Sequence, residues 1–198
     1  METFNAVREF WFGTSLDDAE VADSQGKLWW MKNESTDATI RERFGTMVEA
    51  EANGGYDDRT SPADLLVRII LLDQFTRNIF RGSGEAFAYD ARARNLSNEV
   101  LRDRKDTQLR PIERVFVYLP YEHSESAKDQ ETSIRLYTDL RDDAPDSQRS
   151  TFAGYLDYAE QHKAIIGRFG RYPHRNAVVG RDSTAAESAF LEEPGSSF

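Results

Sequence analysis

One stretch of the chain, residues 64–82 (DLLVRIILLDQFTRNIFRG), combines an apolar run with polar side chains whose types and spacing suit chemistry. Its first half is apolar on nearly every side of a helix, which predicts a helix buried among other helices. Asp73, Arg77 and Arg81 follow at intervals of four and share one helical face. Gln74 and Asn78 lie beside them. Since buried polar groups need partners, these side chains predict a polar cluster at one end of a core helix.

A second polar segment, RYPHRN, lies near the C-terminus and carries Arg175. A guanidinium binds carboxylate or phosphate well because its planar fork offers two parallel hydrogen bonds. We therefore expect Arg77, Arg81 and Arg175 to line a pocket for a small anionic ligand or a peptide carboxylate, with Arg171 as a further candidate. Side chains expected to orient the rest of the ligand are Gln74, Asn78 and Asn176.

The same arginines also fit a purely architectural role. Asp73, Asp90 and Glu125 can pair with them and fix helices against one another without any ligand. The sequence leaves three functions open: an anion-binding module of the helical-repeat kind, an enzyme, and a protein-interaction scaffold with only structural ion pairs. Whether the protein is an enzyme is undecided at this stage.

Three histidines are present, and their settings differ. His162 falls on the apolar face of a predicted helix, so we expect a core histidine with one hydrogen-bond partner. His123, close to Glu125, and His174 fall in predicted loops and are better candidates for acid–base work in a hydrolase-like enzyme. No HExxH motif or local pair with metal-ligand spacing occurs, so neither a metal nor another cofactor is expected.

Composition narrows the classes of protein. The net charge of −10 over 198 residues argues against general binding to nucleic acid or to an anionic membrane. There are no cysteines, which excludes disulfides and a catalytic thiol and suits a cytoplasmic protein. No secretion signal and no apolar run long enough to span a bilayer are evident. The oligomeric state is left open.

Hydrophobic periodicity predicts an all-α protein, with a single helical domain over residues 1–198 and a short, frayed tail at 193–198. No segment shows the alternation of a β-strand. Start and stop signals include Ser61 before Pro62, Gly170, and the capping-box pair Thr184 and Glu187. The predicted helices cover residues 3–12, 36–52 (capped by Ser35 or Thr36), 62–81, 85–104, 111–119, 125–141 (capped by Ser124), 147–169 and 185–191.

Four segments in order along the chain, EFWFG, DQFTRNIFRG, YLPYEHSES and FGRYPHRNAVVGRDST, resemble the bacterial domain-of-unknown-function 924 family. The resemblance implies antiparallel helix pairs in a tetratricopeptide-like, right-handed superhelix. It implies no activity, so no residue roles carry over from the family. Thr76 stands where the family commonly has proline, which is expected to remove a kink from the polar end of the helix.

Overall fold

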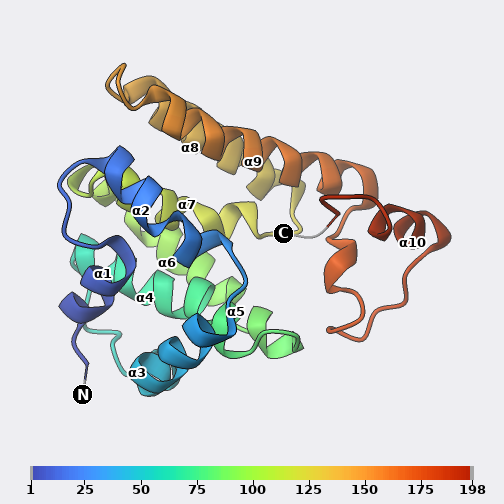
Figure 1. The fold of residues 1–198 in the computed structure, drawn as a ribbon, viewed down its shortest axis with the longest axis horizontal. Helices are drawn as coiled ribbons and strands as arrows, with labels where there is room; N and C mark the ends of the chain where they lie inside the picture. Colours follow the sequence, from blue (N-terminus) through green and yellow to red (C-terminus); the bar gives the residue numbers. More distant parts are fainter. Residues whose placement is uncertain (1, 197–198) are drawn as a thin grey trace.

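The computed structural model describes residues 2–196, and these contain helices and turns but no strand (Figure 1). The all-α prediction is therefore confirmed. In chain order the α-helices and the short 3-10 or π segments are α1 (Phe4–Phe12), α2 (Asp18–Trp30), α3 (Glu34–Ala52), α4 (Pro62–Ile69), η1 (Ile70–Phe75), α5 (Thr76–Ile79), η2 (Gly84–Phe87), α6 (Asp90–Arg102), η3 (Lys105–Gln108), α7 (Pro111–Glu122), α8 (Ala127–Asp143), α9 (Arg149–Phe169), η4 (Pro173–Arg175) and α10 (Ala185–Leu191).

The segments α4, η1 and α5 follow one another directly and form the core helix that the apolar run predicts. Ser61 caps it by accepting a hydrogen bond from the Asp64 amide, and Pro62 opens it. Every residue from Leu65 to Phe75 is buried, and the run packs against α3, α6 and α7. The π turn of η1 is a local widening of the helix, a feature found frequently at functional sites.

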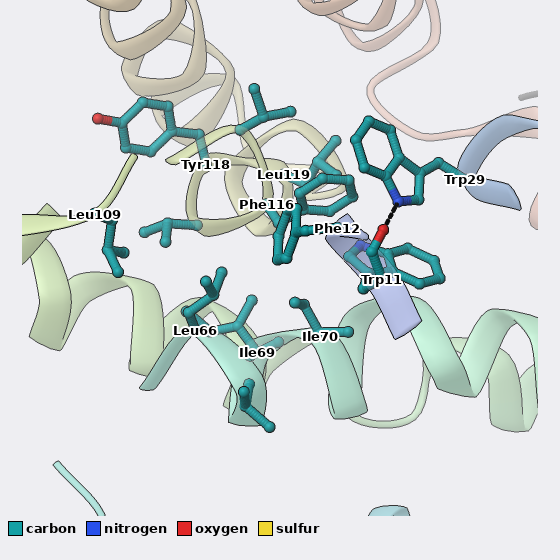
Figure 2. Packing of buried hydrophobic residues seen from close by; sticks show 14 of the residues in the cluster. Trp11, Phe12, Trp29, Leu66, Ile69, Ile70, Leu109, Phe116, Tyr118 and Leu119 are labelled. Carbon is teal, nitrogen blue, oxygen red and sulfur yellow. Dashed lines mark hydrogen bonds between the residues drawn. The ribbon is translucent and has the colours of Figure 1, made fainter. Parts of the chain in front are cut away.

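Aromatic side chains from three helices fill the core beside this helix (Figure 2). Phe116 of α7 lies within 5.6 Å, ring centre to ring centre, of Trp11, Phe12 and Trp29. The Trp29 indole donates a 2.9 Å hydrogen bond to the carbonyl oxygen of Trp11, so its polar atom is satisfied inside the core. Trp11 and Phe12 of the N-terminal aromatic run therefore pack in the core and do not form a surface for stacking a ligand.

The C-terminal third begins with α8 and α9, which lie side by side as an antiparallel pair along one edge of the molecule (Figure 1). Gly170 ends α9 in the left-handed conformation, with φ +69°. Beyond it, Tyr172 and Phe190 pack with the end of α9 in a small second apolar cluster. This turn at Gly170 sends residues 171–180 back toward the polar end of the core helix.

Several predicted helix ends are confirmed, and others are wrong. Thr184 and Glu187 form the predicted capping box of α10. The caps of α3 and α8 are Asn33 and Ser126, since their side chains accept the first free amides instead of those of the predicted residues.

Two further differences have physical causes. The helix α2 was missed because it is polar on most sides and buries few residues, and Asp17 caps it. Pro120 does not end α7, which continues to Glu122 and places His123 at its C-cap. A helix tolerates an internal proline when tertiary packing outweighs the lost hydrogen bond, and all of Val115–Glu122 is buried.

The predicted helix over residues 85–104 is divided into η2 and α6, so Asp90 becomes the first residue of α6. The predicted frayed tail spans residues 193–198. Within it, the Ser196 hydroxyl donates a hydrogen bond to the Leu191 carbonyl. Residues 197 and 198 lie outside the described range.

Candidate functional site

The buried carboxylate of Asp73 is the centre of a polar cluster at the end of the core helix. Asp73 sits in the π turn, is fully buried, and accepts a 2.6 Å hydrogen bond from the neighbouring Gln74 amide. The Nδ1 atom of His123, at the C-terminal end of α7, lies 2.8 Å from Asp73 Oδ1. An Arg77 nitrogen lies 3.4 Å from the same oxygen. Contacts from three directions therefore fix the orientation of this carboxylate.

Arg77 and Arg175 meet at a second carboxylate, Asp90. A terminal nitrogen of Arg77 lies 3.1 Å from each oxygen of Asp90, and a terminal nitrogen of Arg175 lies 3.4 Å from one of them. Both guanidinium groups also lie over the ring of Phe87, at 5.5 and 4.6 Å from its centre. The two polar segments that are far apart in the sequence thus contact the same carboxylate and the same aromatic ring.

His162, Tyr172 and Glu122 lie next to these groups. The His162 ring is centred 6.3 Å from that of His123 and 5.6 Å from that of Tyr172. Its Nδ1 lies 2.8 Å from the Tyr158 carbonyl oxygen and 3.3 Å from Glu122 Oε1. Because a carbonyl only accepts, Nδ1 of His162 carries the proton. His162 is buried with a hydrogen-bond partner, so its prediction as a core histidine is confirmed.

The two carboxylates of the cluster titrate in opposite directions. Burial alone would raise the pKa of Asp73, but the charges of Arg77 and His123 outweigh it and hold that pKa well below its usual range. Burial raises the pKa of Asp90 in spite of Arg77, and the negative charge of Asp73 adds to the effect. Asp73 is therefore the permanent anion of the pair, and Asp90 is the weaker counter-ion.

The neighbouring groups are held mainly in their neutral forms. Burial raises the pKa of Glu122 to about 8. Burial lowers the pKa of His162 to about 3 and that of His174 to about 4. The pKa of His123 is lowered by burial and by Arg77, against the pull of Asp73. Near neutral pH the permanent charges of the cluster are thus Asp73 and the two guanidiniums. Asp90 holds its negative charge less firmly than Asp73, because its pKa is raised.

The other predicted site residues lie in separate contacts. Arg81 forms a two-pronged ion pair with Asp37, at 2.6 and 2.8 Å, and Asn78 donates to the same carboxylate. Asn78 belongs to α5 and Arg81 to the turn that follows it, so these contacts join the end of α5 to α3. Arg81 and Asn78 therefore belong to a structural contact beside the cluster rather than to the cluster itself.

The C-terminal candidates divide in a similar way. Glu125 accepts a 2.9 Å hydrogen bond from the Tyr172 amide and pairs with Arg181 at 2.7 Å, so it anchors the returning segment. Arg171 is paired with Glu187 at 2.6 Å. The Asn176 amide donates to the Ser183 hydroxyl at 3.1 Å. The residues of the original prediction that the structure brings together are Asp73, Gln74, Arg77, His123, His174 and Arg175.

Sequence reasoning did not include Asp90, Phe87, Glu122 or Tyr172 among the site residues. The sequence does mark Glu122, because a carboxylate at the end of the apolar run IERVFVYLPYE is predicted to be buried. No comparable local signal marks the others, because their roles depend on which residues the fold places opposite them.

The cluster reaches solvent at only a few side chains. Those of Arg77 and His123 keep 20% and 13% of their surface exposed. Two surface hollows, of about 310 and 530 Å³, lie elsewhere, the first beside Arg8 and Arg110 and the second beside Arg168 and Arg171. Within residues 2–196, no three His, Asp or Glu side chains are arranged to hold a metal ion. A ligand of the cluster would therefore be small and would contact mainly Arg77, His123 and the edge of Arg175.

These observations define an all-helical protein with a partly buried Arg–Asp–His cluster at one end of its core helix. Residues 7–195 match the family model described as "Bacterial protein of unknown function (DUF924)", and the chain belongs to this family. The solved structure of the protein of unknown function ATU0120 from Agrobacterium tumefaciens is similar, with a TM-score of 0.74 and 32% sequence identity over 89% of this chain and 99% of that one. Comparison with curated proteins finds no match. Among the described helices, none is both long and apolar enough to cross a membrane.

Proposed function

We propose that the protein is a binding module for a small anionic ligand, a phosphate or a peptide carboxylate, held by Arg77 and Arg175. The observation that carries the proposal is the unused hydrogen-bonding capacity of Arg175. This side chain is buried, yet its hydrogen bond to Asp90 is long, at 3.4 Å, and its Nε finds no hydrogen-bond partner within residues 2–196. A guanidinium has five donors, and leaving a buried donor unpaired costs about 1–3 kcal/mol. An oxyanion would supply the acceptor.

Charge balance supports the same role. The pKa of Arg175 is lowered by burial and then by the neighbouring positive charge of Arg77. Two guanidiniums that share a weak counter-ion gain stability from any added negative charge beside them. The surrounding protein is acidic, with a net charge of −10, so a local pair of arginines is distinct from its general surface.

Sulfate, inorganic phosphate and acetate are suitable probes, with thermal unfolding and titration calorimetry as measurements. A ligand at one hundred times its Kd stabilises the native state by about 2.7 kcal/mol. We expect wild-type protein to be stabilised by at least one of these anions and Arg175→Gln to bind it at least tenfold more weakly. Arg81→Gln is the matched control, because Arg81 lies four residues after Arg77, just beyond the end of α5, but is paired with Asp37.

The opposing outcomes are equally definite. No stabilisation of the wild type by any of the three anions, or an equal loss in Arg175→Gln and Arg81→Gln, would leave these arginines as structural ion pairs. The protein would then be better described as an interaction scaffold, the reading in which Asp73, Asp90 and Glu125 serve only to hold helices together.

An enzyme remains the second proposal because of one contact. The 2.8 Å approach of His123 to the buried Asp73 is the arrangement in which a carboxylate orients a histidine for acid–base work. The ring of His174, the other candidate, is centred 5.6 Å from that of Tyr172. We favour His123 because of its direct contact with Asp73.

The proposal also covers the helix arrangement, the location and the partners of the protein. The tetratricopeptide-like right-handed superhelix is supported by the contacts that the successive helices α7, α8 and α9 make with one another. A cytoplasmic location is supported by the lack of cysteine. We propose no nucleic-acid, membrane or cofactor partner, and small-angle scattering would test the monomeric or oligomeric state.

A further inference from the structure

We propose that His123 is the proton-transferring residue of this anion site: it takes up a proton at Nε2 when an oxyanion docks against Arg77 and Arg175, and Asp73 is its positioning residue. The inference rests on the proposed function, since it requires an anion at the two arginines. It assigns one of the three histidines, and one atom of that histidine, to the chemistry of the site.

The tautomer of His123 follows from its partner. Asp73 is ionised, and an ionised carboxylate only accepts hydrogen bonds. The Nδ1 atom, 2.8 Å from Asp73 Oδ1, must therefore be the donor. In the neutral ring this leaves the lone pair on Nε2. Because the side chain keeps 13% of its surface exposed while Nδ1 faces a fully buried carboxylate, Nε2 is the ring nitrogen available to solvent or ligand.

Asp73 is itself held in place, which makes it a suitable positioning group. Its second oxygen accepts the 2.6 Å hydrogen bond from Gln74, and its first also faces Arg77 at 3.4 Å. Every residue of the π turn that carries Asp73 is buried. The imidazole is therefore fixed by a carboxylate that cannot rotate away, as an oriented acid–base group requires.

The charges around His123 come from five elements. Asp73 of η1 and Asp90 of α6 favour the imidazolium, whereas burial and Arg77 of α5 oppose it. His162 of α9 faces it at 6.3 Å between ring centres, and His174 and Arg175 of η4 complete the surroundings. With the site empty the opposing effects keep the ring mainly neutral. An oxyanion beside Arg77 cancels the main positive charge that opposes protonation, so a proton from solvent is taken up at Nε2 as the anion binds.

Sulfate is the probe of choice because it does not titrate between pH 5 and 9, so any proton taken up belongs to the protein. Calorimetric titration at pH 6.5 in two buffers of different ionisation enthalpy measures this uptake. We expect roughly half to one proton per sulfate bound, and an affinity that rises as pH falls, by up to about tenfold per pH unit. His123→Gln should abolish the uptake and, with it, most of the rise in sulfate affinity as pH falls.

Two matched variants locate the proton. His174→Gln and Asp90→Asn should both retain the uptake, since neither group is the proposed acceptor. Uptake that survives in His123→Gln, or that disappears in Asp90→Asn, would overturn the assignment. Asp90 is the relevant competitor because its pKa is raised and it shares the two arginines.

The role of Asp73 has a readout that does not need the ligand. With only three histidines, ¹⁵N spectra of the ring nitrogens can be assigned from single variants. We expect His123 to show the Nδ1–H form in the wild type and a mixture of tautomers in Asp73→Asn. A wild-type ring already in the Nε2–H form would overturn the positioning role. If sulfate binds without proton uptake, this inference fails while the anion site stands; if sulfate does not bind, the proposed function fails and the inference fails with it.

Discussion

The hydroxyl of Tyr172 donates a hydrogen bond to the backbone carbonyl oxygen of Glu122 and joins the returning C-terminal segment to the end of α7. The same hydroxyl accepts a 3.0 Å hydrogen bond from Gln130, so the tyrosine also contacts α8. Tyr172 is fully buried. Through this residue the loop that carries Arg175 is fixed relative to the helix end that carries His123.

Replacing Tyr172 with phenylalanine should therefore weaken both stability and the site. The change removes two buried hydrogen bonds, each worth roughly 0.5–1.5 kcal/mol, so we expect a loss of about 1–3 kcal/mol in the free energy of unfolding. Urea denaturation measures it. Tyr158→Phe is the control, because the Tyr158 side chain is 57% exposed, and it should stay within about 0.5 kcal/mol of the wild type. Equal stabilities of the two variants would contradict the bridging role of Tyr172.

A second buried contact predicts a larger effect. Arg68 of the core helix pairs with the fully buried Glu51 of α3 at 2.8 Å. Removing one partner of such a pair leaves an uncompensated charge, and we expect Arg68→Met to cost about 3–5 kcal/mol. We expect a loss toward the lower end of this range, because Arg92, 3.2 Å from Glu51, still offers that carboxylate a positive charge.

The control for Arg68 is an exposed pair in the same protein. Arg135 lies 4.0 Å from Asp139 on the surface of α8, and Arg135→Ala should cost less than about 1 kcal/mol. The double variant Arg68→Met with Glu51→Leu should recover part of the loss, because both charges are then removed. Chemical denaturation of all three variants checks the order, and a double variant less stable than the single one would count against this account.

The raised pKa of Glu122 predicts how stability depends on pH. Its usual value of 4.5 is raised by burial to about 8 in the native state. Between these values the native protein holds a proton that the unfolded chain has released, so stability falls as pH rises. His162 acts in the opposite sense between pH 3 and 6.5. The window from pH 6.5 to 8 therefore isolates Glu122.

We expect wild-type stability to decrease across that window by at most about 1.4 kcal/mol per pH unit. Glu122→Gln keeps the shape of the side chain but cannot ionise, so its stability should be nearly constant there. Urea denaturation at pH 6.5, 7.25 and 8 tests the prediction. His162→Gln serves as the comparison, since it should alter the acid limb and leave the slope above pH 6.5 in place. Parallel curves for wild type and Glu122→Gln would show that Glu122 is ionised throughout.

The π turn makes a prediction about a proline in place of Thr76. The Thr76 amide contacts the carbonyl oxygen of Gln74, and the Leu72 carbonyl, four residues back, accepts a 2.7 Å hydrogen bond from the Thr76 hydroxyl. Because the regular helical hydrogen bond is already replaced here, the main cost of Thr76→Pro is the loss of this hydroxyl from a buried carbonyl, about 1–2 kcal/mol. Lys163→Pro in the regular interior of α9 should cost about 3 kcal/mol or more. Thermal unfolding of the two variants tests the difference, and similar losses would refute it.

The sequence alone predicted the buried core helix, its Ser61 and Pro62 start, the capping box of α10 and the burial of His162. These features depend on periodicity and on contacts between residues three or four apart, so a short stretch of sequence is enough to predict them. It missed α2, whose polar surface lacks a clear apolar stripe, and it ended α7 at Pro120. There the local preference of proline was outweighed by packing of the surrounding buried residues.

The tertiary structure decided which of the predicted site residues meet. Arg77 and Arg81 are residues of the same type four positions apart, yet one contacts Asp73 and Asp90 and the other Asp37. Arg175 joins the first group only because Gly170 reverses the chain and Tyr172 holds the segment against α7. The types and spacing of residues determined that polar side chains would need partners. The identity of those partners depended on long-range packing, because a charged side chain accepts any opposite charge that the fold brings within reach.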